Sequence, residues 1–159
     1  MRVLIVDDEP IVRESMSELL PWKEMGFETI LCARDAYDAQ KELELERIDV
    51  LISDIEMPGM DGLALSKWVH ERFPRTVILL LTCHASFSYA QSAIRYGVMD
   101  YLLKPVIKTD LEQCVQKAIR LIQEENKKIE IENEAYHWKK NKPHIMESLW
   151  HDVLVYHLD

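Results

Sequence analysis

The stretch Val3-Leu4-Ile5-Val6-Asp7-Asp8-Glu9-Pro10 contains a short apolar run, then three acidic residues, then a proline. The apolar run is too short for a helix, and its β-branched residues are typical of a strand that is buried on both faces. Proline is favoured in the first turn of a helix, where an N–H group would have no partner anyway. The stretch therefore predicts a buried strand, an acidic turn and a helix that starts at Pro10.

The same alternation continues along the chain. Further apolar runs lie at 29–32, 50–52, 77–81 and, more weakly, 101–103. Between them, Asp35, Asp61 and Ser86 are residues of the kind that cap helix N-termini. Thr109-Asp-Leu-Glu112 has the spacing of a capping box and predicts that a fifth helix opens at Thr109. Five buried strands that alternate with helices predict a (βα)5 fold, an α/β protein with a parallel sheet covered on both faces.

The sequence changes character beyond Gln123. Residues 124–142 are rich in Glu, Lys and Asn and contain no Gly or Pro, so we expect the fifth helix to continue as an extended C-terminal helix. Apolar residues recur there every seven positions, at Val115, Ile122, Ile129 and Tyr136. Polar residues occupy other positions of the same seam, so a dimerising coiled coil and a solvated connector both remain open.

The last residues carry a second apolar pattern. It lies after Pro143 and consists of Ile145, Met146, Leu149, Trp150, Val153 and Leu154. An apolar face of this size is expected to pack against a partner chain or another domain. We therefore predict two parts, a domain at 1–123 and a helical linker at 124–159.

Composition limits the class of protein. Nineteen Lys and Arg against 28 Asp and Glu give a net charge of −9, so the chain lacks the basic surface of a nucleic-acid binder. Its three cysteines are widely spaced, which indicates neither a disulfide framework nor a zinc site. The N-terminal residues lack the long apolar core and small-residue cleavage site that we would expect of a signal peptide, and no apolar run is long enough to cross a membrane. We expect a cytoplasmic protein without membrane contact.

Polar residues follow the ends of four predicted strands. Asp7 and Asp8 follow the first strand and Asp54 the third, while Thr82 follows the fourth and Lys104 the fifth. Ligands of an open parallel sheet bind beyond the carboxyl ends of its strands. We therefore expect three carboxylates, a hydroxyl and an ammonium group to converge at one edge of the sheet.

This set of groups favours phosphoryl chemistry. Clustered carboxylates repel one another, and their pKa values would rise unless a cation lay among them. Mg²⁺ prefers hard oxygen ligands, binds few protein groups and accepts phosphate oxygens. A carboxylate beside Mg²⁺ can attack a phosphoryl group and form an acyl phosphate. The hydroxyl and the ammonium would then bind the phosphoryl oxygens.

Four motifs together resemble the receiver domain of two-component response regulators. They are Leu4-Ile-Val-Asp-Asp-Glu-Pro10, Asp54-Ile-Glu-Met-Pro-Gly-Met-Asp-Gly62, Leu80-Leu-Thr82 and Asp100-Tyr-Leu-Leu-Lys-Pro105. The resemblance covers residues 1–123 and implies a flavodoxin-like, doubly wound sheet with strand order 2-1-3-4-5. It implies a signalling switch rather than an enzyme, since its only chemistry would be the gain and loss of its own phosphoryl group.

The resemblance also implies roles for the acidic residues. Asp54 would accept the phosphoryl group from a sensor histidine kinase. Asp7, Asp8 and Asp54 would hold Mg²⁺ together with the backbone carbonyl of Glu56.

The remaining site residues would act after phosphorylation. Thr82 and Lys104 would bind the phosphoryl oxygens, and Tyr101 would turn inward as Thr82 moves. The peptide bond before Pro105 would be cis. The surface formed by the fourth helix, the fifth strand and the fifth helix would change, and a homodimer through this surface or through the C-terminal helix is left open.

Further segments are similar to the YesN-like subfamily. They are Leu20-Pro-Trp22, Gly26-Phe27 and Ser86-Phe-Ser-Tyr-Ala90, followed by the charged helix. These regulators continue with a helical linker and an AraC-type helix-turn-helix domain. Such a domain does not fit in the residues after Gln123, so we expect a piece of a longer transcriptional regulator that binds DNA only through its output domain.

Three residues are expected at the mouth of the site. Cys83 stands where receivers usually have Ala or Gly, and it is either a tolerated small residue, a source of crowding or an oxidisable thiol. Glu56 and His84 are expected to be exposed and to tune the access of water to the acyl phosphate.

Two other functions remain open. A haloacid-dehalogenase-like phosphatase uses a second Asp two residues after its nucleophile, where this chain has Glu56. A degenerate receiver, which acts as an interaction module without phosphorylation, has no need of the full set of acidic, threonine and lysine residues.

Overall fold

The structure, a computed structural model, describes residues 1–140. Its strands are β1 (Arg2–Val6), β2 (Thr29–Ala33), β3 (Val50–Asp54), β4 (Val77–Thr82) and β5 (Asp100–Leu103). Its helices are α1 (Pro10–Leu19), α2 (Ala36–Leu45), α3 (Gly62–Arg72), α4 (Phe87–Arg95) and α5 (Lys108–Lys140). The apolar face predicted after Pro143 lies outside the described residues.

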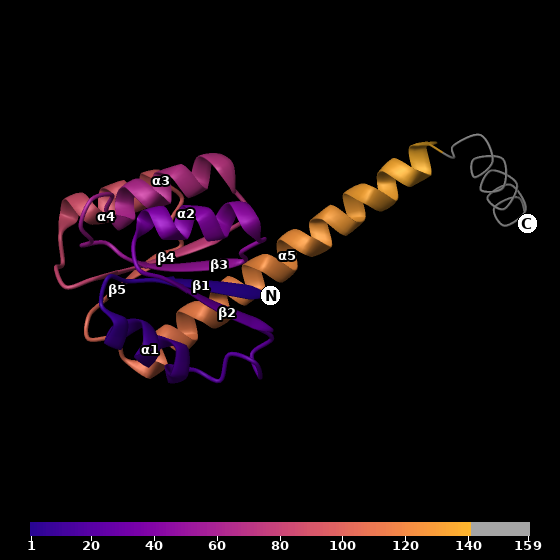
Figure 1. Cartoon of the computed structure of the whole chain (residues 1–159). Coiled ribbons are helices and arrows are strands. Elements are labelled where there is room, and N and C mark those ends of the chain that lie inside the picture. The colour runs from indigo at the N-terminus through magenta and orange to yellow at the C-terminus, as the bar shows by residue number, and fades with distance from the viewer. Residues whose placement is uncertain (141–159) are drawn as a thin grey trace, which may run out of the picture. The chain divides into compact units, whose positions relative to one another are not determined.

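The five strands form one parallel sheet in the order β2-β1-β3-β4-β5, which confirms the predicted order. In its register, Leu4 of β1 pairs with Leu31 on one side and Leu51 on the other. Helices α1 and α5 cover one face of this sheet, and α2, α3 and α4 cover the other (Figure 1). The fold is the predicted doubly wound α/β fold.

Side chains cap three of the helices as predicted. Asp35, Asp61 and Ser86 each accept a hydrogen bond from the backbone N–H three residues further on, at 2.7, 2.8 and 3.4 Å. Each bond satisfies an N–H group that has no partner within its helix. The predicted starts of α2, α3 and α4 are thereby confirmed.

Two predictions about the elements are wrong. Helix α5 begins at Lys108 rather than at Thr109, because the Leu111 N–H already donates to the Ile107 carbonyl at 3.0 Å. Thr109 therefore lies inside the first turn. The second error concerns burial: β2 and β5 are only partly buried. They are the edges of the sheet, so each has a neighbouring strand on one side only.

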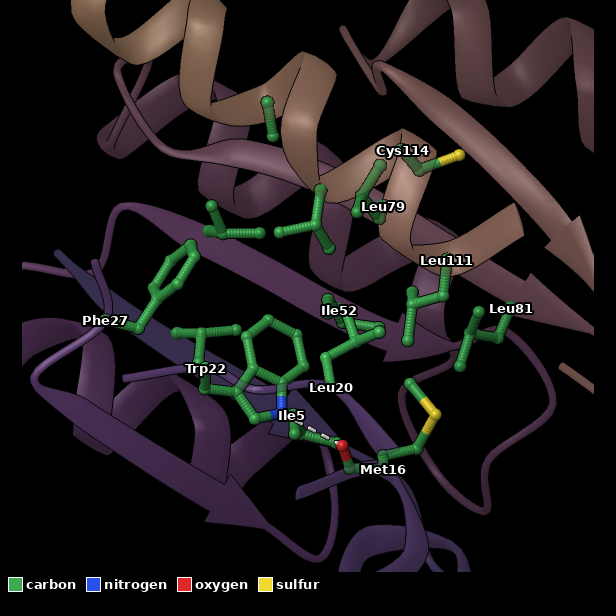
Figure 2. Packing of buried hydrophobic residues seen from close by; sticks show 14 of the residues in the cluster. Ile5, Met16, Leu20, Trp22, Phe27, Ile52, Leu79, Leu81, Leu111 and Cys114 are labelled. Atoms are coloured by element: carbon green, nitrogen blue, oxygen red, sulfur yellow. Dashed lines mark hydrogen bonds between the residues drawn. The ribbon is translucent and has the colours of Figure 1, made fainter. Parts of the chain in front are cut away.

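The core beneath α1 and α5 is built around an aromatic pair. Trp22 and Phe27 lie in the segment between α1 and β2, and their ring centroids are 5.4 Å apart in an edge-to-face arrangement (Figure 2). The Trp22 indole N–H donates to the Met16 carbonyl at 3.1 Å, so this buried polar group is satisfied. This packing fixes the chain that leads from α1 back to the sheet.

Helix α5 belongs to two compact units of the chain, 1–122 and 123–159. In the first unit one side of the helix is buried in the core, through Leu111, Cys114, Val115, Ala118 and Ile122. In the second, Ile131 and Tyr136 are 57% and 63% exposed. These exposed side chains leave the predicted dimerising helix and solvated connector both open. Within the described residues, no helix is long and apolar enough to span a lipid bilayer.

Candidate functional site

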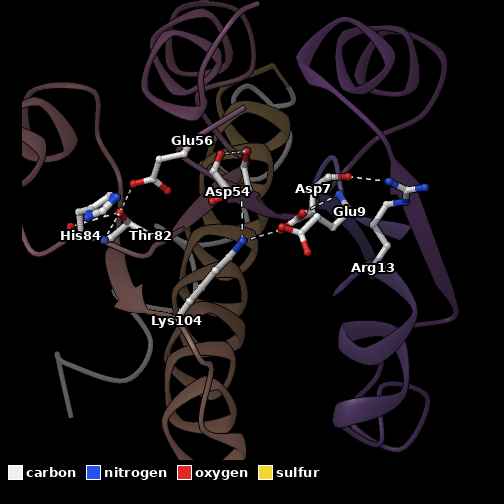
Figure 3. A network of polar contacts seen from close by, with 9 residues as sticks. Asp7, Glu9, Arg13, Asp54, Glu56, Thr82, His84 and Lys104 are labelled. Atoms are coloured by element: carbon white, nitrogen blue, oxygen red, sulfur yellow. Dashed lines mark hydrogen bonds and ion pairs between the residues drawn. The ribbon is translucent and has the colours of Figure 1, made fainter. Parts of the chain in front are cut away.

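The polar residues singled out in the sequence meet at one edge of the sheet. Asp54 and Thr82 are the last residues of β3 and β4, and Asp7 and Lys104 directly follow β1 and β5. Because the strands are parallel, their carboxyl ends lie on the same side, and Figure 3 shows these side chains grouped there.

Lys104 links two carboxylates at the centre of the site. Its Nζ lies 2.8 Å from Asp7 Oδ2 and 3.2 Å from Asp54 Oδ2. Burial disfavours the charged amine, but the hydrogen bond to Asp7 and the charges of Asp54 and Asp7 outweigh it and raise the pKa of Lys104. The ammonium group therefore stays charged and holds both carboxylates.

The Asp54 carboxyl group has a strongly raised pKa. Burial raises the pKa of Asp54 to about 6; the Lys104 charge opposes this rise, and the charges of Asp7 and Glu56 add to it. Its two oxygens differ, since Oδ2 faces Lys104 while Oδ1 is buried with no hydrogen-bond partner among the described residues. A buried oxygen of this kind can accept a cation or act as a nucleophile.

The acidic turn after β1 is held by two further contacts. The Glu9 N–H donates to Asp7 Oδ1 at 2.9 Å, and Arg13 Nη1 donates to the Asp7 carbonyl at 2.7 Å. These bonds fix both the side chain and the backbone of Asp7. The role of Arg13 was not predicted, because its partner is a main-chain oxygen that leaves no trace in the sequence.

The carboxylates fit a divalent cation. Asp7, Asp8 and Asp54 each offer an oxygen, and these oxygens all lie within 4.8 Å of one another. Asp7 and Asp54 are buried, whereas Asp8 is exposed, so one side of the cluster is open to solvent. A few carboxylate oxygens beside water are the ligands that Mg²⁺ prefers. A cation bound here would also compensate for the burial of Asp54 Oδ1, which has no hydrogen-bond partner among the described residues. The residues present therefore fit the predicted ion.

Thr82 is fully buried and already hydrogen-bonded. Its hydroxyl donates to Glu56 Oε1 at 2.5 Å and accepts from the His84 N–H at 3.1 Å. Glu56 is therefore half-buried with its carboxylate directed into the site, and the prediction that it is exposed is wrong. The hydrogen bond to Thr82 is the reason. The His84 side chain is exposed.

The Glu56 carboxylate is ionised at neutral pH. Burial would raise its pKa, but the hydrogen bonds that it accepts from the Thr82 hydroxyl and from the backbone N–H groups of Glu56 and Cys83 lower the pKa overall. The site thus contains four carboxylates and one ammonium group.

The other predicted residues surround this centre. Tyr101 lies on β5 and is half-buried, and its backbone N–H donates to Asp100 Oδ1 at 2.8 Å. Cys83 is exposed next to Thr82. The Lys104–Pro105 peptide bond is cis.

Comparison with known proteins agrees with this fold and identifies the family. A family model described as the response regulator receiver domain matches residues 3–116. The transcriptional regulatory protein YesN of Bacillus subtilis (strain 168) is 31% identical over 150 residues, which are 94% of this chain and 38% of that protein. The transcriptional regulatory protein HptR of Staphylococcus aureus (strain NCTC 8325) is 32% identical over 124 residues, 78% of this chain and 48% of that protein.

A solved structure shows the same fold. The receiver domain of AraT, a response regulator from Geobacillus stearothermophilus, is 40% identical and superposes with a TM-score of 0.71 over 79% of this chain and 97% of that one.

The fold and the acidic sheet edge are those of a (βα)5 receiver, a signalling module of two-component systems. The chain belongs to the response regulator receiver family. It spans less than half the length of the curated relatives named here.

Proposed function

We propose that this chain is a phosphorylation-controlled switch in which Asp54 accepts a phosphoryl group from the phosphohistidine of a sensor kinase. The asymmetry of Asp54 carries this proposal. Its Oδ2 lies 3.2 Å from the Lys104 ammonium, while its Oδ1 is buried and has no partner among the described residues. One oxygen is held by Lys104, and the other has no hydrogen bond that an attack on phosphorus would have to break.

The transfer itself needs an ionised Asp54. With a pKa of about 6, the carboxylate is ionised at neutral pH. Asp54 Oδ1 attacks phosphorus, a new O–P bond forms, and the P–N bond to the kinase histidine breaks. The histidine leaves with the electron pair of that bond and takes up a proton. The product is an acyl phosphate on Asp54 that water later hydrolyses.

The neighbouring groups offset the added charge. Asp7, Asp8 and Asp54, with the Glu56 backbone carbonyl, would hold Mg²⁺, which when bound supplies positive charge next to the phosphoryl oxygens. Lys104 would bind a phosphoryl oxygen with its ammonium group, and Thr82 would bind another with its hydroxyl.

The surface formed by α4 and β5 would transmit the change that phosphorylation causes at the site. A phosphoryl group adds roughly −1.5 to −2 charge at neutral pH, enough to move Thr82 and Lys104 and, with them, Tyr101 on β5. The surface of α4 and β5 exposes three large apolar side chains, Phe87, Ile94 and Leu103, which suit a contact that forms on activation. Either a second copy of this chain or an output domain would bind there.

The relatives suggest what is controlled. Because YesN and HptR are transcriptional regulatory proteins longer than this chain, we infer that a receiver at 1–123 passes its signal through the linker at 124–159 to a DNA-binding domain. The proposed kinase partner and DNA target are both reached from the cytoplasm, so we infer that this protein acts there.

Incubation of the 159-residue chain with acetyl phosphate tests the proposal. We expect one phosphoryl adduct by intact-mass spectrometry, dependent on Mg²⁺ and absent from Asp54→Asn. No adduct under any condition would favour the degenerate receiver. Release of many phosphates per chain would favour the phosphatase.

A further inference from the structure

In the unphosphorylated chain the Thr82 hydroxyl already donates one hydrogen bond and accepts another. A hydroxyl has one proton to donate, and two acceptors lie near it, Glu56 Oε1 at 2.5 Å and the His84 carbonyl at 3.2 Å. The nearer acceptor is also charged, so the proton is donated to Glu56. The lone pairs of Oγ1 accept from the His84 N–H at 3.1 Å.

Glu56 is well placed to keep this hydroxyl. It lies in the turn between β3 and α3, two residues after Asp54, and its carboxylate is directed towards the end of β4 (Figure 3). Its second oxygen, Oε2, is buried with no hydrogen-bond partner among the described residues. The bond to Thr82 is therefore the main side-chain contact that compensates for the burial of this carboxylate.

We propose that Glu56 holds Thr82 in the unphosphorylated state, and that the hydroxyl reaches the phosphoryl group only by leaving Glu56. This inference rests on the proposed phosphorylation of Asp54. The Glu56 carboxylate and the phosphoryl oxygens are both anionic acceptors for a single O–H group. The Glu56–Thr82 bond lowers the free energy of the resting state. It therefore shifts the equilibrium away from the geometry in which Thr82 binds the phosphoryl group.

Removal of the carboxylate should therefore favour the phosphorylated geometry. In Glu56→Ala the Thr82 hydroxyl retains only the neutral His84 carbonyl, a weaker and more distant acceptor. The loss of one charge-assisted bond, partly compensated in this way, corresponds to an increase of about threefold to tenfold in affinity for a phosphoryl mimic.

Repulsion between Glu56 and the phosphoryl group would act in the same direction, so the test must separate the two causes. Repulsion acts through space and does not need the Thr82 hydroxyl, whereas the proposed competition does. A double-mutant cycle between Glu56 and Thr82 distinguishes them. Thr82→Val removes the hydroxyl and keeps the branched shape that suits β4. If the Thr82→Val chain does not fold, Thr82→Ala is used in the cycle instead.

The experiment measures fluoroberyllate binding to the full chain by ¹⁹F NMR, with beryllium chloride, sodium fluoride and MgCl2 as the probe. We expect Glu56→Ala to bind about threefold to tenfold more tightly than the wild-type chain. The same substitution should have a much smaller effect in a Thr82→Val background, where only repulsion is removed, and its full effect in a Thr82→Ser background, which retains the hydroxyl. The control Glu71→Ala, which removes an exposed carboxylate, should leave the affinity unchanged.

Three results would overturn the inference. Unchanged or weaker binding by Glu56→Ala would show that the hydroxyl is not held. An equal gain in the Thr82→Val background would assign the effect to repulsion alone. If the wild-type chain bound no fluoroberyllate and took no phosphoryl group from acetyl phosphate, the proposed function would fail, and this inference with it.

Discussion

Gly62 lies so close to Asp54 that a Cβ atom on Gly62 would stand 2.1 Å from the Asp54 carbonyl oxygen. The Gly62 N–H donates to the Ile55 carbonyl at 2.9 Å, which draws the start of α3 against the end of β3. The atom that a side chain would meet is backbone and cannot rotate away. The first turn of α3 therefore fixes the position of Asp54, the proposed phosphoacceptor.

Gly62→Ala should lower the free energy of unfolding by about 1–3 kcal/mol, because the added methyl group forces the backbone of β3 and α3 apart. Chemical denaturation measures this loss. Lys67→Ala, an exposed substitution in the same helix, should stay within about 0.5 kcal/mol of the wild-type chain. A tolerated Gly62→Ala would mean that α3 does not define the site.

Asp54→Asn should make the chain more stable in the absence of Mg²⁺, and more so at high pH. Since the pKa of Asp54 rises from 3.8 to about 6, the folded chain binds a proton that the unfolded chain has lost, and stability falls as pH rises through this range. The gain should be about 2 kcal/mol larger at pH 8 than at pH 4. Urea denaturation at the two pH values measures it. A gain independent of pH would contradict the raised pKa.

Lys104→Gln should destabilise the Mg²⁺-free chain. Without the ammonium group, Asp7 and Asp54 repel each other with no opposite charge between them. We expect a loss of about 1–3 kcal/mol at pH 8 and a smaller one below pH 5, where Asp54 is protonated. Lys108→Gln, at an exposed position nearby, is the control. Equal losses in both variants would argue against a central role for Lys104.

Mg²⁺ should stabilise the folded chain through Asp8. At a concentration ten times its Kd, the ion should add about 1.4 kcal/mol to the free energy of unfolding. Because Asp8 is exposed, Asp8→Asn should change the stability without Mg²⁺ very little and should weaken the response to the ion. Thermal unfolding across a MgCl2 titration, with NaCl at matched ionic strength, checks both. An undiminished response would remove Asp8 from the ligand set.

The proposed domain boundary predicts that the receiver folds without most of the linker. A chain that ends at Lys128 retains the buried part of α5, from Leu111 to Ile122. Its free energy of unfolding should lie within about 1 kcal/mol of that of the full chain, because the removed side chains that the structure describes, at 129–139, are mostly exposed. A larger loss, measured by urea denaturation, would place the boundary further along α5.

The fold could be predicted because local and global signals agree. Short β-branched runs indicated strands, capping residues indicated helices, and the alternation of strands with helices indicated a parallel sheet. Asp35, Asp61 and Ser86 cap helices as expected. Burial of the edge strands was predicted wrongly, since an apolar run does not reveal whether it has one neighbour or two. The start of α5 was missed by a single residue because capping motifs locate helix ends only approximately.

The site was less predictable than the fold. Residues at strand ends could be grouped from topology alone, which brought Asp7, Asp54, Thr82 and Lys104 together. The direction of a flexible side chain could not be predicted in this way, and Glu56, expected to face solvent, points inward to Thr82. Arg13 was also missed, because it bonds to a main-chain carbonyl.

The central claim is that Asp54 carries the phosphoryl group, and site mapping tests it most directly. Sodium borohydride reduces an aspartyl phosphate to homoserine, so the chain can be treated with acetyl phosphate and Mg²⁺, reduced and sequenced by tandem mass spectrometry. We expect homoserine at position 54 and at no other aspartate, with none when Mg²⁺ is omitted. Homoserine at position 7 or 8, or a phosphoryl group found only on a hydroxyl or histidine side chain, would contradict the account.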